Sequence, residues 1–170
     1  MSGFSLTNRS GAAFPSDPSG GDIWFHAGRK VEYYWDDVAG LWLSTTPFTL
    51  DFAGPSTSLA VTATRLDIIT ALSPWSGQYD IFAVDVSHAG YLTATGSWTA
   101  QLRSVNAGTA SAAIAPWTLS TPIGEWVPSG PIAIGQVIAT DVELIQFGAT
   151  KISGAATFYG TACLRYRLVG

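Results

Sequence analysis

Hydrophobic and polar residues alternate with a period of two along much of the second half of the chain. The last segment, 157–168, shows this pattern most clearly. One of its faces collects Phe158, Gly160, Ala162, Leu164, Tyr166 and Leu168. The segments 59–65, 78–86 and 97–103 alternate in the same way, and 136–147 is strand-like with an irregularity near Asp141. A period of two predicts β-strands with one buried face.

The alternation also predicts which side chains share a face. In 78–86, one face is predicted to hold Phe82, Val84 and Val86, and the opposite face Tyr79, Ile81, Ala83 and Asp85. In 97–103, the inward residues are predicted to be Trp98, Ala100 and Leu102, and the outward residues Thr99, Gln101 and Arg103.

The region 45–170 is predicted to be an all-β, antiparallel β-sandwich. Turn residues separate its strands every 8 to 15 residues, and the one helix candidate, 65–72, contains a β-branched cluster that favours a strand. About eight strands in this region suit a jelly roll with two Greek keys. A seven-stranded immunoglobulin-like sandwich is the alternative, although the paired cysteines of antibody domains are missing.

The region 22–44 is predicted to form a small aromatic β-meander. Three short strands, at 23–26, 31–35 and 41–44, are joined by turns that contain glycine. In the second strand, Val31, Tyr33 and Trp35 share one face, whereas Glu32 and Tyr34 share the other. A meander of this size is only marginally stable alone, so we expect it to pack on the sandwich or on another subunit.

Residues 1–21 are rich in Gly, Ser and Pro and have no strand or helix period, which predicts an extended N-terminal arm. One interpretation is a flexible tail. The other is an attachment arm that orders against a partner and buries Phe4, Leu6 and Phe14. In that second interpretation the meander is the rigid base of the arm, and the sandwich projects outward.

Charged residues make up only 12% of the chain, about half of the usual share of roughly 25%. The net charge of −4 and the absence of a basic stripe argue against nucleic-acid binding. Nothing in the sequence predicts a membrane span or a secretory signal. So few charges leave large uncharged surfaces, which predicts a homo-oligomer, with a trimer favoured.

Catalytic and metal-binding patterns are missing from the sequence, so we expect neither enzymatic activity nor a cofactor. His26 and His88 are too few for a three-histidine zinc site, and the Asp36–Asp37 pair suits a turn. Paired acids could cleave a glycosidic bond, but Asp80 and Asp85 fall on opposite faces of their predicted strand, and Glu125 is the one acid beside an aromatic residue in a predicted loop. Cys163, the single cysteine, cannot form an internal disulfide and is expected to be inert.

Aromatic residues are the strongest candidates for contacts with a partner. Those of the meander are Trp24, Tyr33, Trp35 and Trp42. They suit core or subunit packing, contact with a protein partner, or stacking on sugar rings. Those in loops near Pro or Gly are Trp75, Trp117 and Trp126, which are the better candidates for exposed, glycan-binding side chains.

The meander also resembles a module of tailed-bacteriophage virion proteins. The shared pattern is Gly-Asp-Ile-Trp at 21–24, a Tyr-rich strand that ends in Asp at 31–36, and Gly and Trp at 40–42. Val38-Ala39 stands where that family often has a tight Asp-Gly turn, so we expect a wider second hairpin. The stretches 98–103, 107–109 and 166–168 are similar to sandwich domains of phage fibre and head-decoration proteins.

The resemblance implies a structural protein of the virion, assembled in the bacterial cytoplasm and bound to other capsid or tail proteins as an oligomer. The absence of heptads and of a long shaft favours a capsid decoration or cement protein. The alternative is a tail fibre, collar or baseplate adhesin that binds a glycan of the host surface.

Overall fold

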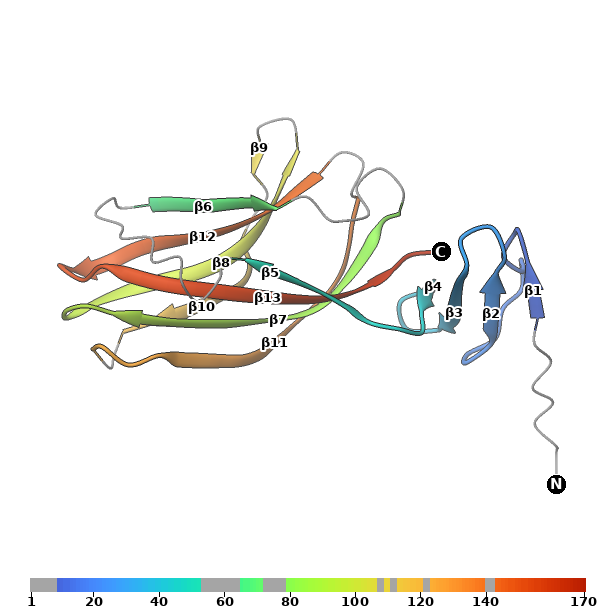
Figure 1. Cartoon of the computed structure of the whole chain (residues 1–170), viewed down its shortest axis with the longest axis horizontal. Coiled ribbons are helices and arrows are strands. Elements are labelled where there is room, and N and C mark those ends of the chain that lie inside the picture. Colours follow the sequence, from blue (N-terminus) through green and yellow to red (C-terminus); the bar gives the residue numbers. More distant parts are fainter. Residues whose placement is uncertain are drawn as a thin grey trace, which may run out of the picture.

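A computed structural model describes residues 9–52, 65–71, 79–106, 109–110, 113–120, 123–139 and 143–170. Within these ranges the chain consists of strands, turns and extended segments, and it contains no helix. The strands form a small sheet at one end of the molecule and a two-layered sandwich beside it (Figure 1). The prediction of an all-β protein is therefore confirmed, and Arg65–Ala71 of the helix candidate form a strand.

The small sheet has four strands in the order β1-β2-β3-β4. Their bounds are β1 Arg9–Gly11, β2 Ile23–His26, β3 Val31–Asp36 and β4 Leu41–Ser44. The last three strands pair antiparallel and form the predicted meander. Two polar side chains shape its turns. The Nδ1 atom of His26 accepts the backbone N–H of Arg29 at 3.1 Å, and Asp36 accepts those of Val38 and Ala39 at 3.0 and 2.9 Å.

Part of the predicted arm 1–21 belongs to this small sheet. β1 pairs with β2 in parallel, the Ala27 N–H donates to the Gly11 carbonyl, and the Gly21 N–H donates to the Trp35 carbonyl. A three-residue edge strand is too short to show a period in the sequence, so the composition alone indicated an arm. Of the three predicted contact residues of the arm, Phe14 lies in the described part, whereas Phe4 and Leu6 lie outside the described residues.

The sandwich consists of two sheets of four long strands each. One sheet has the order β11-β7-β13-β5, with bounds Val127–Ile138, Ile81–Leu92, Phe158–Leu168 and Phe48–Phe52. The other has the order β10-β8-β12-β6, with bounds Ile114–Leu119, Gly96–Asn106, Glu143–Gly154 and Arg65–Ala71. A two-residue strand, β9 at Thr109–Ala110, pairs with β8.

The strand order is that of a jelly roll. Numbered from β5 without the short β9, the eight long strands pair antiparallel as first with eighth, second with seventh, third with sixth, and fourth with fifth. This is the pairing of one long hairpin rolled into two sheets. The immunoglobulin-like alternative is therefore wrong, because its seven strands have a different order.

The core lies between the two sheets, where the inward faces meet. The predicted inward residues Trp98, Ala100 and Leu102 are buried, as is most of the predicted apolar face of β13. Gln101 lies on the face opposite Ala100 and Leu102, as predicted, but it is only 7% exposed. Alternation along a strand does not show whether a neighbouring segment covers the second face.

The face prediction for 78–86 fails beyond Ala83. Ile81 and Ala83 are buried, and so is Val86, which was predicted to lie on the opposite face. The register of β7 against β13 shifts at Val84, between Ala83 and Asp85. A bulge adds one residue to one strand and moves the following side chains to the other face. The prediction of one strand-like segment at 136–147 is likewise corrected, because β11 ends at Ile138 and β12 begins at Glu143.

The C-terminal residues join the small sheet to the sandwich. Leu43 of β4 forms an antiparallel bridge with Val169, and the Gly170 N–H donates to the Trp42 carbonyl at 2.8 Å. Arg167 donates to the carbonyls of Ser44 and Thr45. The meander therefore packs on the sandwich of its own chain, which is one of the two arrangements expected from its size.

Candidate partner-binding surfaces

Four aromatic residues of the meander, Trp24, Tyr33, Trp35 and Trp42, share one face of the small sheet, called the inner face here. Phe14 lies over this face, with its ring centroid 5.0 Å from that of Tyr33 and 5.4 Å from that of Trp42. Trp35 contacts Trp42 at 5.7 Å. Tyr33 is 0% exposed and Trp42 is buried, whereas Trp24 and Trp35 are half-buried. Of the interpretations left open for these residues, packing within the chain fits Tyr33 and Trp42.

The charged group of Arg29 packs over the aromatic side chains of the inner face. Its guanidinium lies 5.7 Å from the Phe14 ring centroid and 5.0 Å from that of Tyr79, and it donates to the Val169 carbonyl at 3.0 Å. Burial raises the pKa of the Tyr33 hydroxyl, and the nearby Arg29 opposes that shift. The inner face is thus the internal core of the small sheet, covered by residues from both ends of the chain.

The opposite face of the small sheet, called the outer face here, is exposed along β2, whereas Leu43 of β4, on the same face, is buried. Ile23 and Phe25 are each 43% exposed, and they lie on the face opposite Trp24 and His26 because side chains alternate along β2. The register places Ile23 beside Tyr34 of β3. Sequence reasoning followed the tryptophans and missed these two residues, although the alternation in 23–26 carried the signal.

A second exposed aromatic group lies at the other end of the molecule. Tyr91 of β7 and Tyr159 of β13 are paired directly across the sheet, and their rings stack with centroids 4.6 Å apart and an interplanar angle of 4°. Trp126, just before β11, meets Tyr91 edge-on at 5.1 Å and is 49% exposed. We call these three residues the aromatic row. Of the predicted loop tryptophans, Trp126 is indeed exposed.

Trp117 and Trp75 are the other two tryptophans that were predicted to lie in loops. Trp117 lies within β10 and is half-buried, with its ring parallel to that of His88 at 6.0 Å. The prediction that it lies in a loop is wrong, because Pro116 stands within a bulge of an edge strand, where proline is tolerated. Trp75 lies outside the described residues.

His88 is buried between Trp117 and Phe147, whose ring centroids are 6.0 and 5.9 Å away. Its Nε2 atom lies 3.0 Å from the Ala115 carbonyl, whereas its buried Nδ1 atom has no hydrogen-bond partner. Burial lowers the pKa of His88, and the bond to Ala115 only partly opposes this. His88 is therefore held neutral, with Nε2–H as the donor, and it joins the two sheets.

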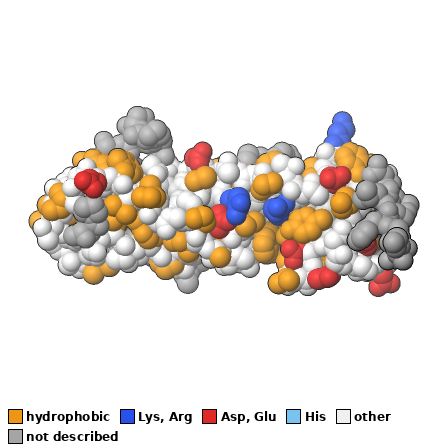
Figure 2. Space-filling model, turned by 90° about the horizontal axis from the view of Figure 1, so that it is seen from below, with side chains coloured by type: hydrophobic (Ala, Val, Ile, Leu, Met, Phe, Trp, Pro, Cys, Tyr) orange, Lys and Arg blue, Asp and Glu red, His pale blue; other side chains and the backbone are white. Residues whose placement is uncertain are grey.

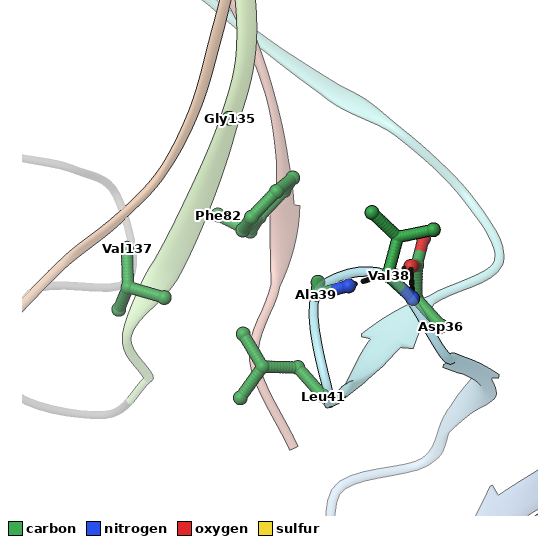
Figure 3. A pocket seen from close by; sticks show the side chains of 7 residues that line it. All are labelled: Asp36, Val38, Ala39, Leu41, Phe82, Gly135 and Val137. Carbon is green, nitrogen blue, oxygen red and sulfur yellow. Dashed lines mark hydrogen bonds between the residues drawn. The ribbon is translucent and has the colours of Figure 1, made fainter.

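A pocket of about 460 Å³ lies where the turn between β3 and β4 faces the sandwich (Figure 3). It is lined by Asp36, Val38, Ala39, Leu41, Phe82, Gly135 and Val137. Its one acid, Asp36, accepts hydrogen bonds from the turn and from the Tyr34 hydroxyl at 3.2 Å. Asp36 is therefore occupied by the turn, as its sequence context predicted.

In the described residues, the remaining candidates for catalysis or metal binding are not arranged as a site. Within the described ranges, no group of three or more His, Cys, Asp or Glu side chains has the arrangement of a metal site. Burial, with Asp51 nearby, raises the pKa of the Cys163 thiol to about 11, so the thiol is a poor nucleophile at neutral pH. The part of the chain that the structure describes also holds no helix able to span a membrane.

Charged side chains are sparse over the surface. Figure 2 shows one long face on which hydrophobic and uncharged polar groups cover most of the area. Among the described residues, the exposed large hydrophobic ones are Ile23, Phe25, Val38, Ile123, Trp126, Val137 and Ile152.

No model of a known protein family and no curated protein matches this chain. Among solved structures, it is similar to one of infectious bursal disease virus, Gx strain, with 15% identity and a TM-score of 0.35 over 71% of this chain and 29% of that one. T=1 particles derived from infectious bursal virus match with 14% identity and a TM-score of 0.32, over 71% and 29%. For the Gt strain the values are 11% and 0.28, over 74% and 35%.

The chain thus spans about a third or less of the length of those proteins. The jelly-roll assignment itself rests on the strand order given above. The tailed-bacteriophage origin that the sequence resemblance implies has no counterpart among these three structures, and it stays a prediction.

Proposed function

We propose that this chain is a non-enzymatic structural protein of a virus particle, and that it binds the particle through the outer face of its small sheet. One observation carries the proposal. The small sheet at one end of the molecule presents Ile23 and Phe25 to solvent, while its tryptophans pack inward. Exposed apolar side chains on a well-braced sheet are suited to docking on a protein surface.

The bracing of the small sheet supports this role. The bridge between Leu43 and Val169, the Arg29 bond to the Val169 carbonyl and the Gly170 bond to Trp42 hold the module against the jelly roll. A partner that binds the outer face therefore gains apolar contact without a large cost for ordering the module. The jelly-roll fold, which recurs among viral capsid domains, and the resemblance to phage virion modules are consistent with the role.

Within this function, we favour a capsid decoration protein that binds as a trimer, which in a tailed phage assembles in the bacterial cytoplasm. The low charge of the chain favours self-association, because uncharged surfaces lose little solvation free energy when they are covered. Light scattering at micromolar concentration is expected to give three times the mass of one chain. A monomer that also fails to assemble on particles would refute the trimer.

The location of the protein tests the main proposal. Antibodies against the purified chain, visualised by immunogold electron microscopy, are expected to label intact virus particles from cells that make the protein. Particles without label, from cells in which the protein is abundant, would overturn the proposal.

The attachment face is tested by charge substitution. The double variant Ile23→Glu, Phe25→Glu is expected to reduce co-sedimentation with particles that lack the protein at least tenfold, because two carboxylates must then be desolvated in the contact. Ile152→Glu, at another exposed position in β12, is the matched control and is expected to bind normally. Normal binding by the double variant would move the contact to another surface.

A further inference from the structure

We infer that the exposed face of the sheet β11-β7-β13-β5 binds a neutral oligosaccharide, which lies along β7 and β13 with one sugar ring stacked on the aromatic row. This site goes beyond the proposed attachment role. Val169, just after β13, pairs with the small sheet, whereas Tyr159 is near the start of β13, roughly 33 Å away at about 3.3 Å per residue. The two surfaces therefore lie at opposite ends of the molecule (Figure 1).

The aromatic row supplies the apolar part of the site. Three rings from three separate segments meet there, and each is partly open to solvent. The C–H face of a pyranose ring is apolar and packs well against an aromatic ring, while its hydroxyl groups stay at the edge. The stacked tyrosines hold each other in place, so little side-chain entropy remains to be lost on binding.

The centre of this face is made of small, partly exposed side chains. The cross-strand pairs that follow the aromatic row are Ala89 with Thr161 and Ser87 with Cys163. None of these four side chains is large, so a ligand stacked on Tyr159 can continue along the strands close to the sheet. The hydroxyls of Ser87 and Thr161 offer both hydrogen-bond donors and acceptors.

A charged pair follows farther along the face. Asp85 lies opposite Arg165, and the Arg165 Nε–H donates to a carboxylate oxygen of Asp85 at 3.0 Å. This pair is six residues from Tyr159 along β13, roughly 20 Å, which leaves room for several sugar rings. Charged groups make the strongest hydrogen bonds to hydroxyls, and the pair carries no net charge. These features suit a neutral saccharide better than an acidic one.

The same features argue against a protein as the main ligand. A stable protein contact buries about 800 Å² on each partner around an apolar centre. Here the large apolar groups stand at the two ends of the face, in the aromatic row and at Phe82 and Val137, and the centre between them is small and polar. One apolar row followed by hydroxyls and charges matches the alternating apolar and polar edges of a sugar chain.

A glycan array probed with the labelled full-length protein tests the inference, followed by calorimetry with maltohexaose, cellohexaose, laminarihexaose and chitohexaose. Saturable binding to at least one neutral oligosaccharide is expected. Tyr159→Ala and Trp126→Ala are each expected to raise the Kd about tenfold, which corresponds to about 1.4 kcal/mol. No saturable binding to any neutral glycan would overturn the inference. It would also be overturned if the chain bound another protein but no glycan.

Two further variants separate a local effect from misfolding. Tyr159→Phe keeps the stacked ring and is expected to bind within about threefold of the unchanged protein. Phe25→Ala removes an exposed aromatic ring at the opposite end, and it is expected to leave saccharide binding unchanged. Loss of saccharide binding in Phe25→Ala would overturn the location of the site. Failure of all saccharide binding with normal particle association would refute this inference alone.

Discussion

The small sheet and the jelly roll bury their aromatic residues in different ways. The jelly roll closes its core with its own two sheets, so Trp98, Phe147 and Phe158 lie between layers that come from one continuous region. The small sheet has a single layer. Its inner face is covered by Phe14 from one side of the sequence and by Gly170 from the other.

The two regions differ in whether they can be stable by themselves. A two-layer sandwich can be stable by itself, whereas a four-stranded single sheet depends on what covers its face. Because its cover includes the C-terminus of the sandwich, the small sheet is expected to unfold whenever the sandwich does. The reverse is not expected. The four predictions below test this asymmetry.

Removing the largest buried side chain of the sandwich is expected to have the largest effect. Trp98 is fully buried, stacks on Phe158 at 5.8 Å and donates from Nε1 to the Ala156 carbonyl at 3.1 Å. Trp98→Ala should lower the free energy of unfolding by about 3–5 kcal/mol, measured by urea denaturation. Hydrogen exchange should show that the small sheet loses protection in the same transition. A small sheet that stays protected after the sandwich unfolds would contradict the asymmetry.

Truncating Phe14 is expected to affect the small sheet alone. Phe14→Ala removes ring contacts with His26, Tyr33 and Trp42 and should cost about 2–3 kcal/mol of local stability. Hydrogen exchange should become faster in 23–44 while β7 and β8 keep their protection. Phe48→Ala, which removes a ring stacked on Tyr166 of the sandwich, is the control and should leave exchange in 23–44 unchanged. Faster exchange throughout the chain in Phe14→Ala would show that the regions are not separable.

Acid is expected to weaken the sandwich through His88. Burial lowers the pKa of His88 from its ordinary value of 6.5, so the unfolded chain takes up a proton that the folded chain does not. The stability that depends on neutral His88 is therefore complete above about pH 6.5 and is lost as the pH falls below it. His88→Phe keeps a ring between Trp117 and Phe147, and it loses a hydrogen bond worth about 1 kcal/mol.

Urea midpoints of both proteins between pH 4.5 and 8 measure this effect. The midpoint of the unchanged protein should fall more steeply on the acid side than that of His88→Phe. Parallel curves would show that His88 does not contribute to the acid sensitivity.

Breaking the ion pair on the sandwich surface is expected to have the smallest effect. Arg165 is about half exposed, so solvent screens its attraction to Asp85. Arg165→Gln should change the free energy of unfolding by less than about 1 kcal/mol, without a change in exchange at the small sheet. A larger loss in thermal denaturation would mean that the pair is part of the structural framework.

Local pattern predicted much of this fold. The period of two located the strands and the buried face of β13, because a strand that borders a core must place its apolar residues on alternate positions. It also separated Val31, Tyr33 and Trp35 from the other face of β3. The low content of helix-forming patterns, together with regular turns, was enough to predict an antiparallel sandwich.

The candidate surfaces were less predictable. Trp126 was identified from its loop context, but its partners Tyr91 and Tyr159 were not, since they are far apart in the sequence and meet only across paired strands. The meander tryptophans were predicted to contact a partner because they are large aromatic side chains. A large aromatic side chain, however, favours burial in a core as strongly as it favours a place in an interface. The exposed residues were the neighbours Ile23 and Phe25.

The sequence by itself determined the class of the protein: an all-β chain with few charges, a small aromatic sheet and no local catalytic motif. Only the tertiary structure decided the strand order of the jelly roll, the bulge at Val84, the parallel pairing of β1 and the meeting of the aromatic row. The physical reason is the separation along the sequence over which each effect acts. Alternation and turn chemistry act between residues a few positions apart, whereas strand pairing is selected by the packing of the whole core.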